Sequence, residues 1–212
     1  MAQLVEASDL KTILGITDNV DDARLDAVAL AAQEMVQAYC GRQFIADDVA
    51  SARVYYADTF RFVEIDDIAC PEGIVIKTDE DDDGIFETTW ADSDYDLWPL
   101  NRKLSGQTWP WTRVQAVAAR DFPWGKRPTV EVTARWGWPI QNCGESGNTQ
   151  QGVPDAVYQA AQIQGVSIFK SADAPLGIAG FGDIGIMRLR QAMHPVAMAL
   201  LAPYRKDPVL VA

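Results

Sequence analysis

The stretch TVEVTARWGWP, residues 129–139, and the stretch VPDAVYQAAQIQGVSIFK, residues 153–170, follow two different hydrophobic patterns in close succession. In the first, apolar and polar residues alternate, which is typical of a β-strand with one buried face. In the second, Pro154 stands at a first helical position beside Asp155, which predicts a helix that runs to about Lys170. The polar, glycine-rich segment 141–152 separates the two. A β unit is therefore expected to end here and a helical unit to follow it.

The N-terminal segment also has a helical pattern. Ser8 and Asp9 precede LKTIL and Gly15 follows it, which predicts a short capped helix. Asp18 or Asn19 can cap a longer helix over about residues 20–40, and Gly41 stands where a C-terminal glycine belongs. One apolar stripe runs along this longer helix and consists of Leu25, Val28, Ala32, Met35, Val36 and Tyr39. A further helix is expected to begin at Pro195 and to end at Pro203.

Between these helices the chain is rich in β-branched and aromatic residues, in short runs separated by turn residues. We expect strands over Arg53–Tyr56, Arg61–Ile65, Gly73–Lys77, Ile85–Thr89, Tyr95–Trp98, Val114–Ala118 and Thr129–Arg135. Such spacing predicts a small antiparallel sandwich or barrel. The fold class is therefore α+β, with the N- and C-terminal helices packed together and the β unit inserted between them.

The expected divisions of the chain follow from these patterns. They are N-terminal helices in 1–46, an inserted β domain in 47–140, C-terminal helices in 141–203 with a glycine-rich loop at 171–185, and a tail in 204–212. The helix near 154–170 carries little charge, so it is expected to lie against other surfaces on most sides, in this chain or in a neighbouring copy.

Charge is distributed unevenly along the chain. Residues 47–96 hold 16 acidic and 3 basic residues, while the whole chain has a net charge of −12. This argues against sequence-specific contact with nucleic acid, which relies on Lys and Arg, and it suits a protein with different partners at its two ends. No apolar run long enough to span a membrane is present, and the N-terminus does not resemble a signal peptide.

The three cysteines, Cys40, Cys70 and Cys143, are widely spaced and odd in number. No CxxC motif or Cys/His spacing suggests a metal site. We therefore expect buried or free thiols in a reducing compartment.

The acidic stretch TDEDDDGIFETTW, residues 78–90, resembles half of a calcium-binding EF-hand loop. Asp79, Asp81, Asp83 and Gly84 match loop positions 1, 3, 5 and 6, but Trp90 occupies position 12, where the loop needs a glutamate. The flanking residues also have strand patterns rather than helical ones. An EF-hand is therefore rejected, and two alternatives stay open: a calcium half-site on a hairpin, or a turn in which Asp and Gly supply only backbone geometry.

Other motifs give weak signals. GFGDIG, residues 180–185, matches a dinucleotide fingerprint but does not connect a strand to a helix, so a glycine loop that becomes ordered against a partner is favoured. His194, the only histidine, precedes Pro195, and helix capping explains it. No nucleophile motif is present, and we expect no enzyme activity; a hydrolase would need two carboxylates in a cleft.

Several segments, in order along nearly the whole chain, resemble the head-to-tail connector adaptors of tailed bacteriophages. This head-completion family is of the lambdoid connector type, here with a β insert. The resemblance rests on SDLKTILGIT with AYCGRQF, on IVIKTDEDDDGIFETTW with YDLWPLN, on VEVTARWGWP followed by VPDAVYQAAQIQG, on FKSADAPLGIAGFGDIG, and on HPVAMALLAPYRK. The hairpin departs from the family's alternating Asp/Gly run at Glu80 and Asp82, which places metal binding there in doubt.

The resemblance implies a structural virion protein made in the bacterial host cytoplasm. Such adaptors form a ring of about twelve copies beneath the portal, although an isolated chain can be monomeric. They extend the channel through which DNA passes without sequence-specific binding, and they dock the stopper or tail-completion protein. They need no cofactor. In related adaptors the C-terminal segment reaches the portal, so the candidates for portal docking here are Pro203, Tyr204, Arg205 and Lys206.

Candidates for contact with a partner or another subunit come from two further segments. The first segment contributes Arg135, Trp136 and Trp138, and a structural role is the alternative for these three residues. The second contributes Gly180, Phe181 and Gly182. The alternative function is a calcium-stabilised β module that recognises carbohydrate or protein through exposed tryptophans, with calcium at Asp79, Asp81 and Asp83.

Overall fold

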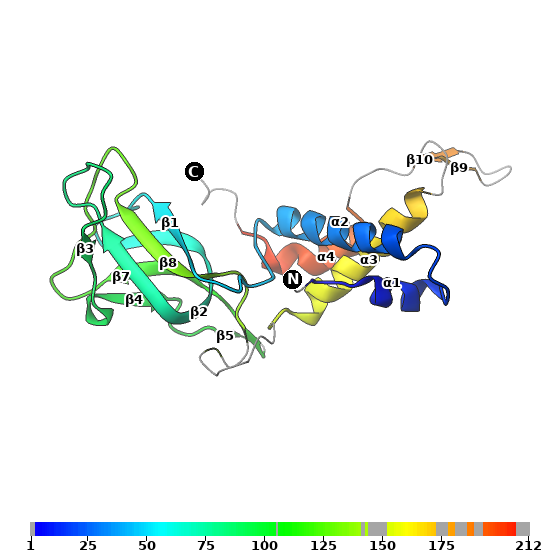
Figure 1. The fold of residues 1–212 in the computed structure, drawn as a ribbon, viewed down its shortest axis with the longest axis horizontal. Helices are drawn as coiled ribbons and strands as arrows, with labels where there is room; N and C mark the ends of the chain where they lie inside the picture. Colours follow the sequence, from blue (N-terminus) through cyan, green and yellow to red (C-terminus); the bar gives the residue numbers. More distant parts are fainter. Residues whose placement is uncertain are drawn as a thin grey trace. The chain divides into compact units, whose positions relative to one another are not determined.

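The computed structural model describes residues 3–104, 106–140, 143, 152–172, 178–180, 186–188 and 193–206. The chain divides into two compact units: a helical unit of Met1–Gly41 with Pro154–Pro208, and a β unit that contains Arg42–Val153 (Figure 1). The sequence placed these divisions at 46/47 and 140/141. The order of helices and strands agrees with the α+β class expected from the sequence.

The helical unit consists of α1 (Ala7–Leu14), α2 (Asp22–Cys40), α3 (Asp155–Ala172) and α4 (Pro195–Leu201). The N- and C-terminal helices pack together as predicted, because α3 contacts α1, α2 and α4. The stripe on α2 faces inward, with Leu25, Val28, Ala32 and Val36 buried. Gly165 on α3 lies close to α1, since a Cβ at this position would lie 2.9 Å from Leu10 Cδ2 and would force the buried Leu10 side chain to shift.

The observed N-caps of α1 and α2 differ from the predicted ones, whereas the two C-terminal glycines and the His194 cap agree with the prediction. The N-cap of α1 is Glu6, and the N-cap of α2 is Asp21, so neither Ser8 and Asp9 nor Asp18 and Asn19 take that position. These helices begin within two to three residues of the expected starts, and Asp21 makes no side-chain capping hydrogen bond. Gly15 and Gly41 end α1 and α2 in the left-handed conformation, at φ 71° and 60°. His194 caps α4, since its Nδ1 accepts a hydrogen bond of 3.2 Å from the Val196 N–H.

The β unit is built on one antiparallel sheet with the strand order β1-β8-β2-β7-β4 and with β3 paired to β2. Its strands are β1 (Ser51–Tyr55), β2 (Phe62–Thr78), β3 (Thr88–Thr89), β4 (Tyr95–Trp98), β7 (Trp111–Ala116) and β8 (Val130–Trp136). Two small hairpins stand outside the sheet, namely β5 (Lys103–Leu104) with β6 (Gln107–Thr108), and β9 (Ile178–Gly180) with β10 (Ile186–Arg188).

The long strand β2 pairs irregularly with its neighbours. It joins two strands that the sequence predicted separately, Arg61–Ile65 and Gly73–Lys77, and it pairs with β7 over its first half and with β8 over much of its length. The pairing register shifts between Cys70 and Val75, where Gly73 has a φ of 74°. Such irregularities bend a strand and increase its twist, so one sheet can enclose a core. That core contains Val63, Ile68, Ile76, Val114, Phe122, Val132 and Trp136, all buried.

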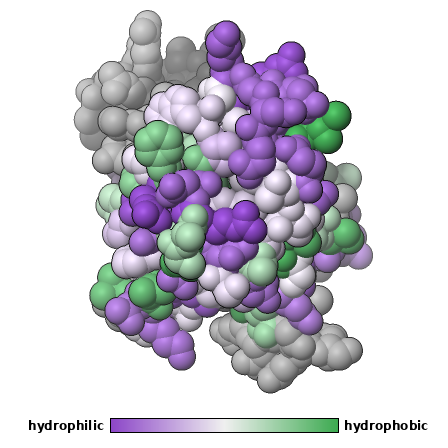
Figure 2. All heavy atoms as spheres, turned by 90° about the vertical axis from the view of Figure 1, so that its left-hand side faces the viewer, coloured by the Kyte–Doolittle hydropathy of each residue, from purple (hydrophilic) through white to green (hydrophobic). Residues whose placement is uncertain are grey.

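One face of the β unit carries many polar residues. Figure 2 shows hydrophilic residues over much of the face in view, with apolar residues among them. No described helix of the chain is both long and apolar enough to cross a membrane.

Candidate functional site

The start of the C-terminal tail lies on the end of α2. Pro203 and Tyr204 belong to a short 3-10 helix, Ala202–Tyr204, that follows α4. The Arg205 guanidinium lies 4.8 Å from the centroid of the Tyr39 ring, and the Lys206 N–H donates a 2.8 Å hydrogen bond to the Cys40 carbonyl.

These contacts have a simple electrostatic basis. The last carbonyls of a helix lack helical partners and carry partial negative charge, and α2 has no basic residue in its own last turn. The basic pair Arg205 and Lys206 supplies positive charge at this place. Pro203 and Arg205 are exposed, so the tail presents a ring and a cation to solvent. Burial, followed by the charge of Asp155, raises the pKa of the Tyr204 hydroxyl.

The acidic loop 79–84 is organised around one buried carboxylate. Asp79 is 0% exposed, and its two oxygens accept hydrogen bonds from the N–H groups of Asp81, Asp82, Asp83 and Gly84 at 2.7–3.3 Å. Burial raises the pKa of the Asp79 carboxyl, but the four backbone donors together outweigh it, so the pKa lies below its ordinary value. The aspartate therefore holds the turn, which is the structural role that one of the two sequence interpretations gave it.

A second aspartate ties this loop to a neighbouring turn. Asp82, at φ 63°, accepts hydrogen bonds of 3.0 Å from the N–H groups of both Lys126 and Arg127. Arg127 in return donates to the Asp83 carbonyl at 2.8 Å. Gly125 permits this approach, because a Cβ there would lie 2.6 Å from Asp82 Oδ1. The sequence gave no sign of this contact.

The same loop gathers carboxylates at metal-binding distances. Oxygens of Asp79, Asp81, Asp83 and Glu87 all lie within 4.8 Å of one another. The negative charge of Asp83, above all, raises the pKa of Asp81 above its ordinary value. Oxygen ligands of this kind suit Ca²⁺, although both oxygens of Asp79 are already hydrogen-bonded.

The residues predicted for subunit contact on ARWGWP are mostly internal, which corrects that prediction. Trp136 and Trp138 are each 0% exposed, so their rings offer no surface to a partner. Trp136 donates from Nε1 to the Ser51 carbonyl at 2.8 Å, and the Trp138 ring lies between Phe44 and Trp109, with centroids 5.4 and 5.3 Å away. Arg135 is half-buried and donates from Nε to the Asp47 carbonyl. Aromatic side chains of this size fill the core, as the structural alternative held.

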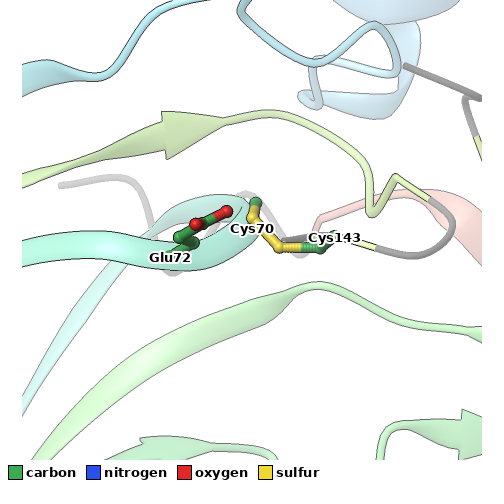
Figure 3. A group of neighbouring side chains, drawn as sticks. All are labelled: Cys70, Glu72 and Cys143. Carbon is green, nitrogen blue, oxygen red and sulfur yellow. A yellow bond between two sulfur atoms is a disulfide. The ribbon is translucent and has the colours of Figure 1, made fainter. Parts of the chain in front are cut away.

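The interpretation of the cysteines as thiols is wrong for two of them. Cys70 on β2 and Cys143 form a disulfide with a Cα–Cα distance of 5.6 Å, and Figure 3 shows this bond beside the exposed Glu72. Their sulfur atoms are thus not available as thiolate ligands. Cys40 is buried and takes no part in a disulfide, as expected.

A groove on α3 was not predicted. Its volume is about 540 Å³, and its lining on α3 includes Gln159, Gln162, Ile163, Val166, Ser167 and Lys170. Ile13 of α1 and His194 also line it. The low charge of α3 was the one available signal in the sequence, since it predicted contact with other surfaces.

The remaining candidates come from the glycine loop. Gly180 is the last residue of β9. Phe181 and Gly182 lie outside the described residues, as does most of GFGDIG and the tail beyond Lys206.

Comparisons with known proteins bear on these surfaces. Residues 5–69 match the family model described as Phage gp6-like head-tail connector protein. No curated protein showed a significant sequence match. Among solved structures, a chain from the neck of an empty GTA particle, computed with C6 symmetry, is similar with a TM-score of 0.59 and 16% identity, covering 99% of this chain and 93% of that one. A chain from the neck of a native GTA particle, computed with C12 symmetry, has a TM-score of 0.49 and 15% identity, covering 100% and 97%.

The family match covers α1, α2 and the first part of the β unit. At 16% identity, the likeness to the neck chain of the empty particle shows a shared fold over both units. The comparisons agree with the resemblance drawn from the sequence: residues 5–69 match the Phage gp6-like head-tail connector family.

Proposed function

We propose that this chain is a head-to-tail adaptor at the head-tail interface of a virion, made in the host cytoplasm. It forms a ring beneath the portal, extends the channel for DNA, and docks a stopper or tail-completion protein. The observation that carries the proposal is the family match at the N-terminal helices together with the two-unit fold. The similar neck chain comes from an assembly computed with C6 symmetry, which supports a cyclic arrangement of copies.

Cryo-electron microscopy of the particle neck tests this proposal directly. The expected result is density for a ring of this chain between the portal and the tail. The family resemblance predicts about twelve copies in this ring. Absence of the chain from purified particles would refute the proposed function.

The proposed portal contact is the exposed start of the tail. Arg205→Glu combined with Lys206→Glu reverses the charge that Pro203–Lys206 presents, so binding to the portal is expected to weaken by at least about tenfold. Lys103→Glu, at an exposed position of β5, is the matched control and should bind as the unaltered chain does. Surface plasmon resonance against immobilised portal measures both. Equal binding by all three proteins would exclude this segment as the contact.

The acidic segment has a proposed role in the channel. If 47–96 lines the ring's lumen, its net negative charge repels DNA phosphates and keeps DNA from adhering during ejection. An assembled ring whose lumen is basic would contradict this role.

A second candidate function is a calcium-stabilised binding module, which the carboxylate cluster at Asp79, Asp81, Asp83 and Glu87 favours. Against it, among the tryptophans only Trp124 is strongly exposed, at 66%. Melting curves separate the two functions. The adaptor function predicts the same melting temperature with calcium and with chelator, whereas a binding module that needs calcium predicts a rise of several degrees through ligand-linked stabilisation.

A further inference from the structure

The groove on α3 is a continuous helical face without a described partner. Gln159, Ile163, Val166 and Lys170 recur at three- and four-residue steps, so they form one stripe along the helix. The stripe is apolar at its centre, through Ile163 and Val166, and polar at its ends. Among the described lining residues, Lys170 is the one with a permanent charge. Ile13 of α1 stands at its side with half of its surface exposed, 50%.

A complementary surface lies on the outer side of α2. Its exposed residues also recur at three- and four-residue steps and are Ala23, Asp26, Ala27, Leu30, Glu34 and Ala38. Four of these six are apolar, and Leu30 is 46% exposed. Both charges in this set are negative. We call this surface the α2 outer face.

The two surfaces point in opposite directions within the helical unit. On α3, Val157, Ala160, Ala161 and Gln164 are buried, and Gln164 contacts Met35 of α2, so this side of α3 faces α2. With 3.6 residues per turn, the groove stripe lies on the other side of α3. By the same geometry, the α2 outer face is opposite the buried stripe of Leu25, Val28 and Val36.

We infer that the α3 groove of one copy receives the α2 outer face of a second copy of this chain. Leu30, between small alanines, enters the apolar centre at Ile163 and Val166. Of the acids Asp26 and Glu34, one turn to either side of Leu30, the one nearer the C-terminal end of the groove lies toward Lys170. Helix-in-groove contacts of this kind use an apolar stripe with complementary flanking charges. Because the surfaces are different and face away from each other, each copy binds the next in the same way, which is a heterologous contact, and such contacts form a ring where the rotation between successive copies closes. The inference rests on the proposed function and names the contact that would build its ring.

Disulfide trapping of the full chain tests this contact. In a variant with both Leu30→Cys and Ile163→Cys, mild oxidation at high protein concentration should give a ladder of dimers, trimers and higher species on a non-reducing gel. Either substitution alone can give no more than dimers, because each copy then offers one new thiol. If the double variant formed no species larger than those of the single variants, the proposed contact would be wrong.

Association measurements supply a second, independent readout. Sedimentation velocity over a concentration series should show self-association that Leu30→Glu and Val166→Glu each weaken by at least about tenfold, by placing charge in an apolar contact. Val20→Glu is the matched control, since Val20 is 86% exposed on the same unit but outside both surfaces, and it should associate normally. Unchanged association in the Leu30 and Val166 variants would contradict the contact.

Other occupants of the groove give distinguishable results. If residues of the same copy cover it, the thiol of a monomeric Ile163→Cys variant will resist a modifying reagent, and the inference fails. A ring seen in particles without L30C–I163C cross-links would refute this contact and leave the proposed function intact. Absence of the chain from the particle neck, with the ladder present, would refute the proposed function alone.

Discussion

At the scale of single residues, Asp79 shows what one side chain adds to a turn. The sequence predicted a turn at 79–84 from its Asp and Gly residues, and it left calcium binding open. It could not reveal that the first aspartate is buried and accepts four backbone hydrogen bonds, because this depends on the conformation of the next five residues. Asp82 is similar, since its partners Lys126 and Arg127 are distant in sequence.

The lowered pKa of Asp79 leads to a pH-dependent prediction. Because the folded chain holds this carboxylate ionised, its contribution to stability is present above the ordinary pKa near 3.8 and is lost as the pH falls through the lower folded value. Asp79→Asn should therefore lower the melting temperature by several degrees at pH 7. The difference from the unaltered chain should narrow below about pH 4.

Thermal melts from pH 7 to pH 2 measure this effect. Asp96→Asn, which removes an exposed carboxylate on β4, is the control and should leave the melting temperature within about a degree. A constant difference between Asp79→Asn and the unaltered chain at every pH would show that the charge of Asp79 is not what stabilises the loop.

At the scale of elements, helices were easier to predict than strands. The helices carry both a 3.6-residue period and local caps, so their positions follow from nearby residues. Strand β2 was predicted as two strands, Arg61–Ile65 and Gly73–Lys77, whereas in the structure the residues between them, Pro71 included, belong to one irregular strand. Proline and glycine mark turns and bulges alike, and only the partner strands distinguish the two.

The disulfide between β2 and Cys143 is expected to contribute to the stability of the fold. It joins Cys70 to Cys143 across a sequence separation of 73, and closing a long loop restricts the unfolded chain. Replacing both cysteines by serine should lower the free energy of unfolding by about 2–4 kcal/mol. Urea denaturation measures the change. Reductant should destabilise the unaltered chain similarly and leave the double variant unaffected; a reductant effect on the double variant would assign the change to another cause.

At the scale of the whole molecule, the order of units could be read from the sequence, but the surfaces that meet partners could not. The change from alternating to helical patterns near Trp136 and Asp155 located the return to helices. Exposure, by contrast, arises only on folding: Trp136 and Trp138 are aromatic and near a unit boundary, yet both are buried. The α3 groove combines residues of α1 and α3 with His194, which are far apart in the chain.

The two proposed contacts, one between copies and one with the portal, should be coupled through the number of copies. A ring engages several portal sites at once, so its apparent affinity exceeds that of one copy by about a hundredfold or more. Leu30→Glu is then expected to weaken binding to a whole portal ring by that factor, although the residue lies outside Pro203–Lys206. Binding of the same variant to a portal fragment with one site should be unchanged, because its tail is intact.

Surface plasmon resonance with the whole portal and with the single-site fragment distinguishes these cases, and the double variant Arg205→Glu, Lys206→Glu should lose binding to both. Val20→Glu provides the matched control and should bind both as the unaltered chain does. If Leu30→Glu weakened binding to the whole portal and to the single-site fragment equally, the α2 outer face would contact the portal itself. The proposed division of roles, with the α2 outer face between copies and the tail at the portal, would then be wrong.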